Sequence, residues 1–228
     1  MQIKQSKQLY VWYEGWGSKY VKKRGVPHST EIQIKDSPTD YAGMWTLYIS
    51  NYHDFPPSGE HAFPKEVYFE VPANNKVLLD YIPWDHNVKI VSKAMLEFFR
   101  EQGFTDGYEV AAVKNVISRR GKTIETPKKY FALRFYTFDD ELLDFQNEVE
   151  IVRKPTTDHI LDVFTIKFSL FPNMRIKEGV EKRIFALEHR TFNDALVFTE
   201  DIKKMIEERG FIGPEIFSME EFYKAFID

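Results

Sequence analysis

The chain has 228 residues, of which 43% are hydrophobic and 29% charged, with 20 Phe, 12 Tyr, 4 Trp and no cysteine. An intrinsically disordered chain is excluded, because such chains are poor in aromatic residues. The lack of cysteine excludes a disulfide scaffold, a thiolate zinc site and a cysteine nucleophile, and it fits a reducing compartment. No run of about 18 apolar residues is present and the first residues lack the apolar segment of a signal peptide. We therefore expect a cytoplasmic protein without a membrane span.

Charge is unevenly distributed along the chain. Residues 1–90 hold ten basic and ten acidic side chains, residues 91–138 nine and five, and residues 139–228 twelve and twenty. A nucleic-acid-binding protein usually carries a concentrated basic field, and only residues 119–122 and 128–129 offer one here. We therefore expect no nucleic-acid partner.

The first ninety residues read as strands joined by proline-rich loops. Alternation of apolar and polar residues predicts strands at Leu9–Tyr13, Glu31–Ile34, Trp45–Ile49 and Val67–Val71. Residues 54–59 contain consecutive prolines, which predict a loop. The aromatic residues around this loop make it either a contact surface or a segment packed against the core.

Two helices are predicted with the same layout, each between a capping residue and a glycine. The first begins after Ser92 and ends at Gly103, and the second begins after Thr199 and ends at Gly210. Serine and threonine can accept a hydrogen bond from the first turn, and glycine readily adopts the left-handed conformation that ends a helix. Shared capping rules explain the likeness better than an internal duplication, because nothing else in the two sequences matches.

Further strands are predicted between and around these helices, at Tyr130–Phe138, Glu148–Val152, Phe164–Phe171 and Arg183–Leu187. Charge brackets the last of them, as it would a central strand. Ser218 and Glu221 have the spacing of a capping box at the start of a short C-terminal helix.

The fold class is therefore predicted to be α+β, with mostly antiparallel strands and a few capped helices concentrated in the C-terminal part. A seam near Val88 divides the chain into a loop-rich β part, residues 1–90, and an α+β part, residues 91–228. A single continuous domain is the alternative.

The sequence contains no recognisable catalytic or metal-binding motif. Residues 15–17 lack the third glycine and the following helix of a phosphate-binding loop, and neither a P-loop nor a Gly-x-Ser-x-Gly elbow is found. No two histidines have the i,i+4 spacing of a zinc helix. His53 and Asp54 come shortly before Glu60 and His61, but loop histidines in solvent are commoner than metal ligands. We expect no catalytic residue, no metal and no cofactor.

The densest acidic cluster consists of Asp139, Asp140, Glu141 and Asp144, directly after a predicted strand. Adjacent carboxylates that face water are better placed to meet a basic partner than to serve as the acid and base of a glycosidase. We predict that these four side chains contact a protein partner, with a solvated turn as the alternative. Residues 80–86 combine aromatic and acidic side chains and suit either a sugar or protein contact or a loop pinned to the core by Trp84.

From about Val91 to the end, the order of features resembles the immunity proteins of bacterial polymorphic toxin systems, especially the groups numbered eleven and forty-three. The matching features are the capped helix ending at residues 101–104, the strand at 129–133, the acidic turn at 139–141, the strand at 183–187 and the block 197–217. In that last block a strand and a capped helix are followed by Gly213 and Phe217. The resemblance implies a protein that binds a cognate toxin domain and neutralises it by stoichiometric occlusion, without catalytic residues.

Two other functions stay open. An enzyme acting on a sugar or a small metabolite would use a cleft between the two halves, lined by convergent carboxylates or histidines. A carbohydrate-binding module would stack sugars on Trp12, Trp16, Trp45 or Trp84, although core packing explains at least two of these tryptophans better.

Overall fold

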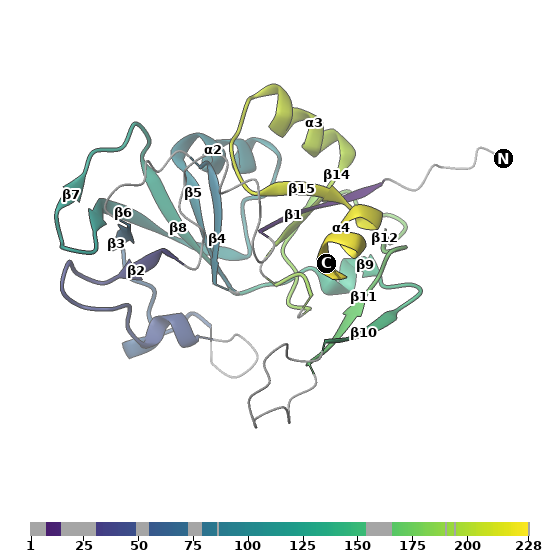
Figure 1. The fold of residues 1–228 in the computed structure, drawn as a ribbon, viewed down its shortest axis with the longest axis horizontal. Helices are drawn as coiled ribbons and strands as arrows, with labels where there is room; N and C mark the ends of the chain where they lie inside the picture. The colour runs from purple at the N-terminus through teal and green to yellow at the C-terminus, as the bar shows by residue number, and fades with distance from the viewer. Residues whose placement is uncertain are drawn as a thin grey trace.

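A seven-stranded sheet, called the larger sheet below, forms the left side of the molecule in Figure 1. The structure is a computed structural model, and it describes residues 8–14, 31–48, 55–72, 79–85, 87–153, 166–189, 191–193 and 195–227. The strand order of the larger sheet is β2-β3-β6-β8-β5-β4, with β7 paired to β6. Its strands are β2 (Gln33–Lys35), β3 (Glu66–Val71), β4 (Tyr81–Asp85), β5 (Val88–Ser92), β6 (Tyr108–Ser118), β7 (Thr123–Ile124) and β8 (Tyr130–Phe135). Neighbouring strands run antiparallel except for β3 and β6, which are parallel.

The smaller sheet is antiparallel throughout and joins the two ends of the chain. Its order is β13-β14-β1-β15, with β13 (Ile184–Phe185), β14 (Leu196–Thr199), β1 (Leu9–Tyr13) and β15 (Glu215–Ser218). Two further antiparallel pairs join β10 (Val149–Arg153) to β11 (Ile166–Leu170) and β9 (Leu143–Asp144) to β12 (Arg175–Ile176). Strands from both sides of residue 90 enter both sheets, and residue 90 itself lies within β5.

The three predicted helices are present in the structure. They are α2 (Lys93–Glu101), α3 (Glu200–Glu208) and α4 (Met219–Ile227). Ser92 Oγ accepts the Met95 N–H at 3.2 Å, as expected of an N-cap. Gly103 and Gly210 have φ of 79° and 66°. In each case the following Phe donates its N–H back into the last turn, to the carbonyl of Phe99 or of Ile206. Both helices therefore end in the same Schellman motif.

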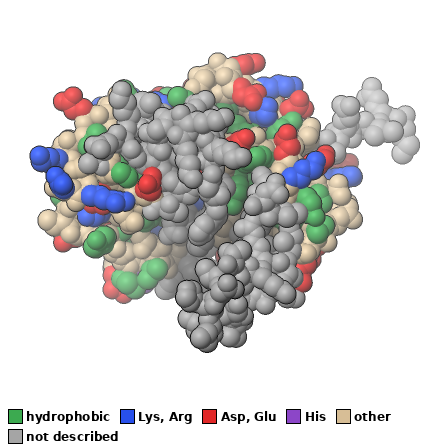
Figure 2. All heavy atoms as spheres, in the orientation of Figure 1, with side chains coloured by type: hydrophobic (Ala, Val, Ile, Leu, Met, Phe, Trp, Pro, Cys, Tyr) green, Lys and Arg blue, Asp and Glu red, His purple; other side chains and the backbone are tan. Residues whose placement is uncertain are grey.

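The start of α3 differs from the expectation. Thr199 occupies the N-cap position but makes no side-chain capping bond to the backbone. Its hydroxyl instead donates to the Asp201 carboxylate. The outer face of α3 carries both signs of charge (Figure 2), arranged in i,i+4 pairs of Lys204 with Glu200 and Lys203 with Glu207, each at 2.8 Å.

The C-terminal helix has the predicted capping box. Ser218 Oγ accepts the Glu221 N–H at 3.2 Å, and Glu221 Oε2 accepts the Ser218 N–H at 2.9 Å. None of the helices in the described segments has both the length and the apolar character needed to cross a membrane.

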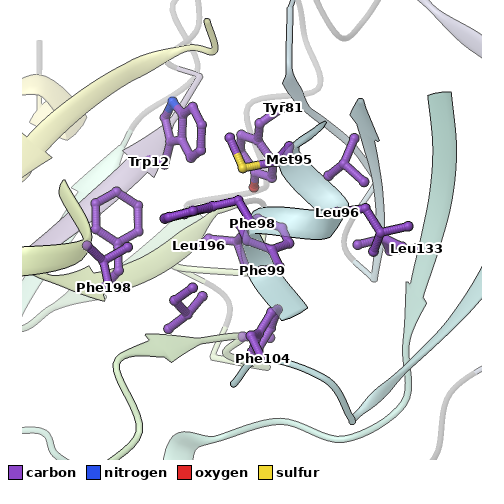
Figure 3. Packing of buried hydrophobic residues seen from close by; sticks show 14 of the residues in the cluster. Trp12, Tyr81, Met95, Leu96, Phe98, Phe99, Phe104, Leu133, Leu196 and Phe198 are labelled. Carbon is purple, nitrogen blue, oxygen red and sulfur yellow. The ribbon is translucent and has the colours of Figure 1, made fainter. Parts of the chain in front are cut away.

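The likeness between α2 and α3 extends to the strands before them. Strand β5 leads directly into α2 and pairs with β4 and β8 on its two sides, while β14 leads into α3 and pairs with β13 and β1. Both helices pack against one shared core, which also takes side chains from both sheets. Figure 3 shows Met95, Phe98 and Phe99 of α2 meeting Trp12 and Phe198 of the smaller sheet.

Alternation along the strands determines which side chains enter this core. In β8, Leu133 and Phe135 face the shared core, whereas Tyr130 and Ala132 face a second cluster on the opposite side of the larger sheet. In β1, Trp12 faces the shared core, whereas Leu9, Val11 and Tyr13 face a third cluster under α4. Helices α2 and α3 thus share a core with one face of each sheet, and a further apolar layer covers the opposite face of each sheet.

The predicted strand Trp45–Ile49 is wrong, because residues 44–47 form the 3₁₀ helix η2 (Met44–Leu47). Trp45 and Tyr48 are buried while Met44 and Leu47 are exposed. This is the period of three that a 3₁₀ helix imposes, not the period of two of a strand. The turn is stabilised by Asp36, which accepts the Gly43 N–H at 3.0 Å and the Trp45 indole N–H at 2.7 Å.

At two other places the structure differs from the sequence prediction. Within the predicted strand Arg183–Leu187 only Ile184 and Phe185 form a strand, and it lies at the edge of the smaller sheet rather than in its centre. Residues 81–85, interpreted as a loop, form β4 at the edge of the larger sheet. An edge position tolerates Pro83, which cannot donate to a second neighbouring strand.

Candidate functional site

The acidic cluster predicted from the sequence lies around the 3₁₀ helix η4 (Asp140–Leu142), opposite residues 186–189. Asp139 is 5% exposed. One of its carboxylate oxygens accepts from Lys182 Nζ at 2.7 Å and the other from the Ala186 N–H at 3.0 Å. Burial raises the pKa of Asp139, and the bonds from Lys182 and Ala186 oppose that rise. Both carboxylate oxygens of Asp139 are thus engaged within the fold.

The other three carboxylates of the cluster differ in exposure. Asp140 is half-buried and accepts the N–H groups of Glu188 and His189 at 2.8 and 3.0 Å. Asp144 is half-buried in β9 and accepts from Gln146 Nε2. Glu141 is exposed. The cluster therefore ties η4 to the segment after β13 and presents Glu141 to solvent.

A hollow of about 300 Å³ opens beside Asp139. Lys182 bridges this hollow, since it pairs with Asp139 and its Nζ lies 5.3 Å from the centre of the Phe104 ring. Tyr136, also on its rim, stacks on Phe55 with ring centres 4.0 Å apart. The loop at residues 55–58 is therefore packed against the residue that follows β8, yet it is partly open, because Phe55 is 52% exposed.

His189, next to the acidic turn, is packed among aromatic rings. The rings of Phe145, Phe171 and Phe192 lie 5.6, 5.0 and 6.0 Å from it, and its Nδ1 accepts the Thr191 N–H at 3.3 Å. Burial lowers the pKa of His189 from its ordinary value of 6.5, although the nearby carboxylates of Asp140 and Glu148 oppose that shift. The neutral imidazole is thus the form that the fold favours.

This lowered pKa predicts a loss of stability in mild acid. Below pH 6.5 the unfolded chain binds a proton at His189 more readily than the folded chain does, so the free energy of unfolding falls as the pH drops. In urea unfolding at pH 7.5, 6.5 and 5.5, His189→Asn is expected to show a smaller decline than the wild type. Asparagine keeps an acceptor for the Thr191 N–H but cannot titrate. Equal declines in the two proteins would contradict the assignment.

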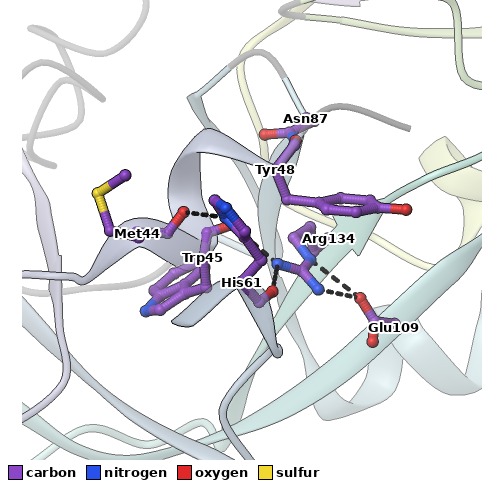
Figure 4. A network of polar contacts seen from close by, with 7 residues as sticks. All are labelled: Met44, Trp45, Tyr48, His61, Asn87, Glu109 and Arg134. Carbon is purple, nitrogen blue, oxygen red and sulfur yellow. Dashed lines mark hydrogen bonds and ion pairs between the residues drawn. The ribbon is translucent and has the colours of Figure 1, made fainter. Parts of the chain in front are cut away.

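The most extensive buried polar network is centred on Arg134 of β8, which is fully buried (Figure 4). Its Nε donates to Glu109 Oε2 of β6 at 2.9 Å. Its Nη1 donates to two main-chain carbonyls, that of Trp45 in η2 and that of His61 in η3 (Gly59–His61), each at 2.8 Å. One guanidinium thus links the larger sheet to both short helices.

Aromatic rings enclose this guanidinium. Its central carbon lies 4.7 Å from the Tyr48 ring centre and 4.8 Å from that of Phe63. The sequence offered one signal for Arg134, a lone charge in the otherwise apolar strand Tyr130–Phe135. Spacing alone does not distinguish such a residue from one that is solvated, because charged residues are mostly exposed.

Exposed apolar side chains come from η2 and from the segments beside the two short helices. Tyr41, Met44, Leu47 and Phe55 are exposed by 73%, 43%, 59% and 52%. We call these four residues the apolar patch. The prediction of a strand at 45–49 concealed it, because a strand would have placed Trp45 and Leu47 on the same face.

A second buried network surrounds Asp80, just before β4. Its carboxylate accepts from Ser92 Oγ at 2.6 Å, from Lys128 Nζ at 2.7 Å and from the Ile212 N–H at 2.9 Å. Asp80 therefore joins the larger sheet, the start of α2 and the segment after α3. A hollow of about 330 Å³ beside it is lined in part by Lys93 and Lys129.

The remaining sequence candidates have structural positions. Trp12 and Trp45 are buried, as core packing predicted, and the Trp84 indole N–H donates to the Ile32 carbonyl at 3.1 Å. Trp16, His53 and Asp54 lie outside the described residues. Within the part of the chain that is described, no three His, Asp or Glu side chains gather as a metal ion would require. Arg119, Arg120 and Lys122 are exposed at the turn between β6 and β7.

Apolar side chains that gather on an exposed surface are typical of proteins that bind other proteins. The family model described as Immunity protein 43 matches residues 19–228, and the chain belongs to that family. The resemblance to the group numbered forty-three is thereby confirmed, and the family is one of immunity proteins. A search of curated proteins found no match.

The family match reaches much further towards the N-terminus than the resemblance seen from Val91 onward. It includes β2, η2, η3 and β3, and with them Arg134's carbonyl partners and the apolar patch. The short helices therefore lie within the part of the chain that the family model matches.

Proposed function

We propose that this protein neutralises a cognate bacterial toxin domain by binding it one to one and covering its active site. The observation that carries the proposal is the family match over residues 19–228, together with an exposed apolar patch on a rigid support. Occlusion needs a pre-formed contact surface and no reacting group. The cytoplasm is the compartment in which such a protein would protect the cell that makes it.

Under this proposal the protein catalyses no reaction of its own. The two hollows described above each border a buried carboxylate, Asp80 or Asp139, and each of these accepts from a lysine and from the backbone. Carboxylates held in this way serve as structural links between elements. The alternative, an enzyme acting on a sugar or small metabolite, would need one of them to exchange its partners for a substrate.

The direct test is co-expression of this chain with the toxin domain encoded beside it, in a host that the toxin domain alone kills. Survival, together with a one-to-one complex on gel filtration, is the expected result. Continued killing with both proteins soluble would reject the proposal and return attention to the hollow at Asp139.

The acidic turn is proposed to attract a basic toxin surface before contact. Neutralising Asp139, Asp140, Glu141 and Asp144 together is expected to slow association and to flatten its dependence on salt. Because Glu141 is the exposed member, Glu141→Gln alone should lower the association rate constant by about threefold at low ionic strength. Stopped-flow mixing at several salt concentrations measures both effects.

Asp139→Asn is the matched control for Glu141→Gln. It also removes one negative charge, but from a buried carboxylate paired with Lys182, so it should lower the free energy of unfolding by about 1–2 kcal/mol and leave the association rate nearly unchanged. If Glu141→Gln associates as fast as the wild type at every salt concentration, the turn has no part in attracting the partner.

A further inference from the structure

We infer that the apolar patch, Tyr41, Met44, Leu47 and Phe55, is the surface that docks the toxin domain, and that the toxin presents there an apolar area bordered by Lys and Arg side chains. The inference rests on the proposed function and specifies its contact surface and the chemistry of its partner. It names other residues than the acidic turn, which the sequence had suggested as the contact, although Phe55 stacks on Tyr136 at the rim of the hollow beside Asp139.

Exposure and residue type are the first argument. Monomeric proteins seldom expose large contiguous apolar areas, and surfaces that do so are usually interaction sites. Tyrosine, phenylalanine and methionine are the types enriched in the centres of protein interfaces. Figure 2 shows hydrophobic side chains at the lower left of the molecule, where Figure 1 places the short helices that follow β2.

The rigid support of the patch is the second argument. Met44 and Leu47 lie on the outer side of η2, whose Trp45 carbonyl is bound by the buried guanidinium of Arg134. Figure 4 shows the Met44 side chain directed away from that guanidinium. The carbonyl of Met44 lies 3.2 Å from His61 Nδ1, a contact that joins η2 to η3. A surface ordered before binding loses less conformational entropy when it binds.

The charge around the patch defines the partner. Among the described residues 31–48 and 55–66, the exposed charged side chains are Lys65 on the basic side and Glu31, Asp36, Asp40, Glu60 and Glu66 on the acidic side. Of these acids, Glu66 is paired with Lys114 at 3.3 Å. The other lysine of this stretch, Lys35, is buried against Glu70 at 2.8 Å. An apolar centre with an acidic border complements an apolar area with a basic border.

The same charge argues against a second copy of this chain as the occupant. Two copies that met through their patches would bring Asp40 and Glu60 of one against the same acidic border of the other. Like charges facing each other across an interface cost several kcal/mol. The exposed acids therefore favour a foreign, basic partner.

The test measures binding of the full-length protein to its toxin domain for charge-bearing variants of exposed apolar residues. Met44→Glu and Leu47→Glu, made together, are expected to weaken binding by about 100-fold. Val110→Glu is the matched control, since Val110 is also exposed but precedes Ala111 on β6, far from η2 in the chain. It should change the dissociation constant by less than about threefold. Thermal unfolding of each variant verifies that the fold is kept.

A reversal of charge tests the chemistry of the partner. Asp40→Lys with Glu60→Lys should lower the association rate constant by about tenfold at low salt, with a smaller effect at high salt. Wild-type affinity in the Met44/Leu47 variant, with the complex intact, would overturn the docking surface and leave the proposed function standing. Failure of the wild type to bind would overturn both. Self-association that the Met44/Leu47 variant abolishes, without loss of toxin binding, would assign the patch to a second copy and also overturn the inference.

Discussion

Gly213→Ala is expected to lower the free energy of unfolding by about 3 kcal/mol, because its new methyl group has no space. A Cβ at this position would lie 2.6 Å from Nε1 of Trp12 and closer still to two carbons of the ring. The ring cannot easily move away. It is 1% exposed, stacks on Tyr81 with ring centres 4.6 Å apart, and donates its indole N–H to the Pro214 carbonyl at 3.0 Å.

Urea unfolding of Gly213→Ala and of the control Gly121→Ala measures this effect. Gly121 has a left-handed φ of 73° but no neighbouring atom near its Cβ position, so alanine there should cost only about 1 kcal/mol, from backbone strain alone. A Gly213→Ala variant as stable as the Gly121 control would show that the close contact with Trp12 is absent. A Trp12→Leu substitution should restore part of the loss in a double-mutant cycle.

Arg134→Met is expected to destabilise the protein by about 3–5 kcal/mol. The substitution keeps an apolar stem of similar length but leaves Glu109 without its cation, and the carbonyls of Trp45 and His61 without a donor. Burial of such unsatisfied groups carries the full cost of removing them from water. The short helices should also separate from the sheet, since the guanidinium contacts both of them.

Chemical denaturation gives the change in stability, and limited proteolysis within residues 41–63 detects release of the short helices. Glu109→Gln is the control, because the amide oxygen still accepts from Arg134 while the carboxylate charge is lost. We expect it to cost about 1 kcal/mol and to leave the protease pattern unchanged. Arg134→Lys should resemble Arg134→Met more than the wild type, because an ammonium group cannot span the same set of acceptors. Wild-type stability in Arg134→Met would mean that the aromatic rings alone hold η2 and η3.

Contacts across residue 90 determine whether the chain forms one domain or two. The predicted boundary at residue 90 follows a real change in composition, from proline-rich loops to the first capped helix. Strand pairing crosses it in both sheets, with β1 between β14 and β15 and β3 beside β6. Asp80 adds a direct link from the first part to Ile212 in the second. We propose that residues 1–90 and 91–228 fold as one unit.

Local rules explain why parts of this fold could be predicted from the sequence. Ser92, the Ser218–Glu221 pair and the glycines at 103 and 210 act on backbone groups within a few residues, so their roles follow from spacing alone. The strand Leu9–Tyr13 is apolar throughout because both of its faces are covered, and in Val67–Val71 the apolar Val67, Phe69 and Val71 share one face of the strand. The family resemblance rests on the same local blocks, and the family match confirms it.

Features that depend on contacts between distant parts of the chain could be seen only in the tertiary structure. Residues 44–47 were predicted to be a strand, but Asp36 and Arg134 both bond to Trp45 and stabilise a 3₁₀ helix there. Arg134 is 89 residues away from Trp45 in the sequence. Asp139 belongs to an acidic run in the sequence, yet Lys182 and Ala186 draw it into the interior. The identity of a residue limits which bonds it can make, but only the folded chain brings the partners within reach. For this protein, spacing determined where helices begin and end, and tertiary contacts decided which charges are buried and which apolar side chains face the solvent.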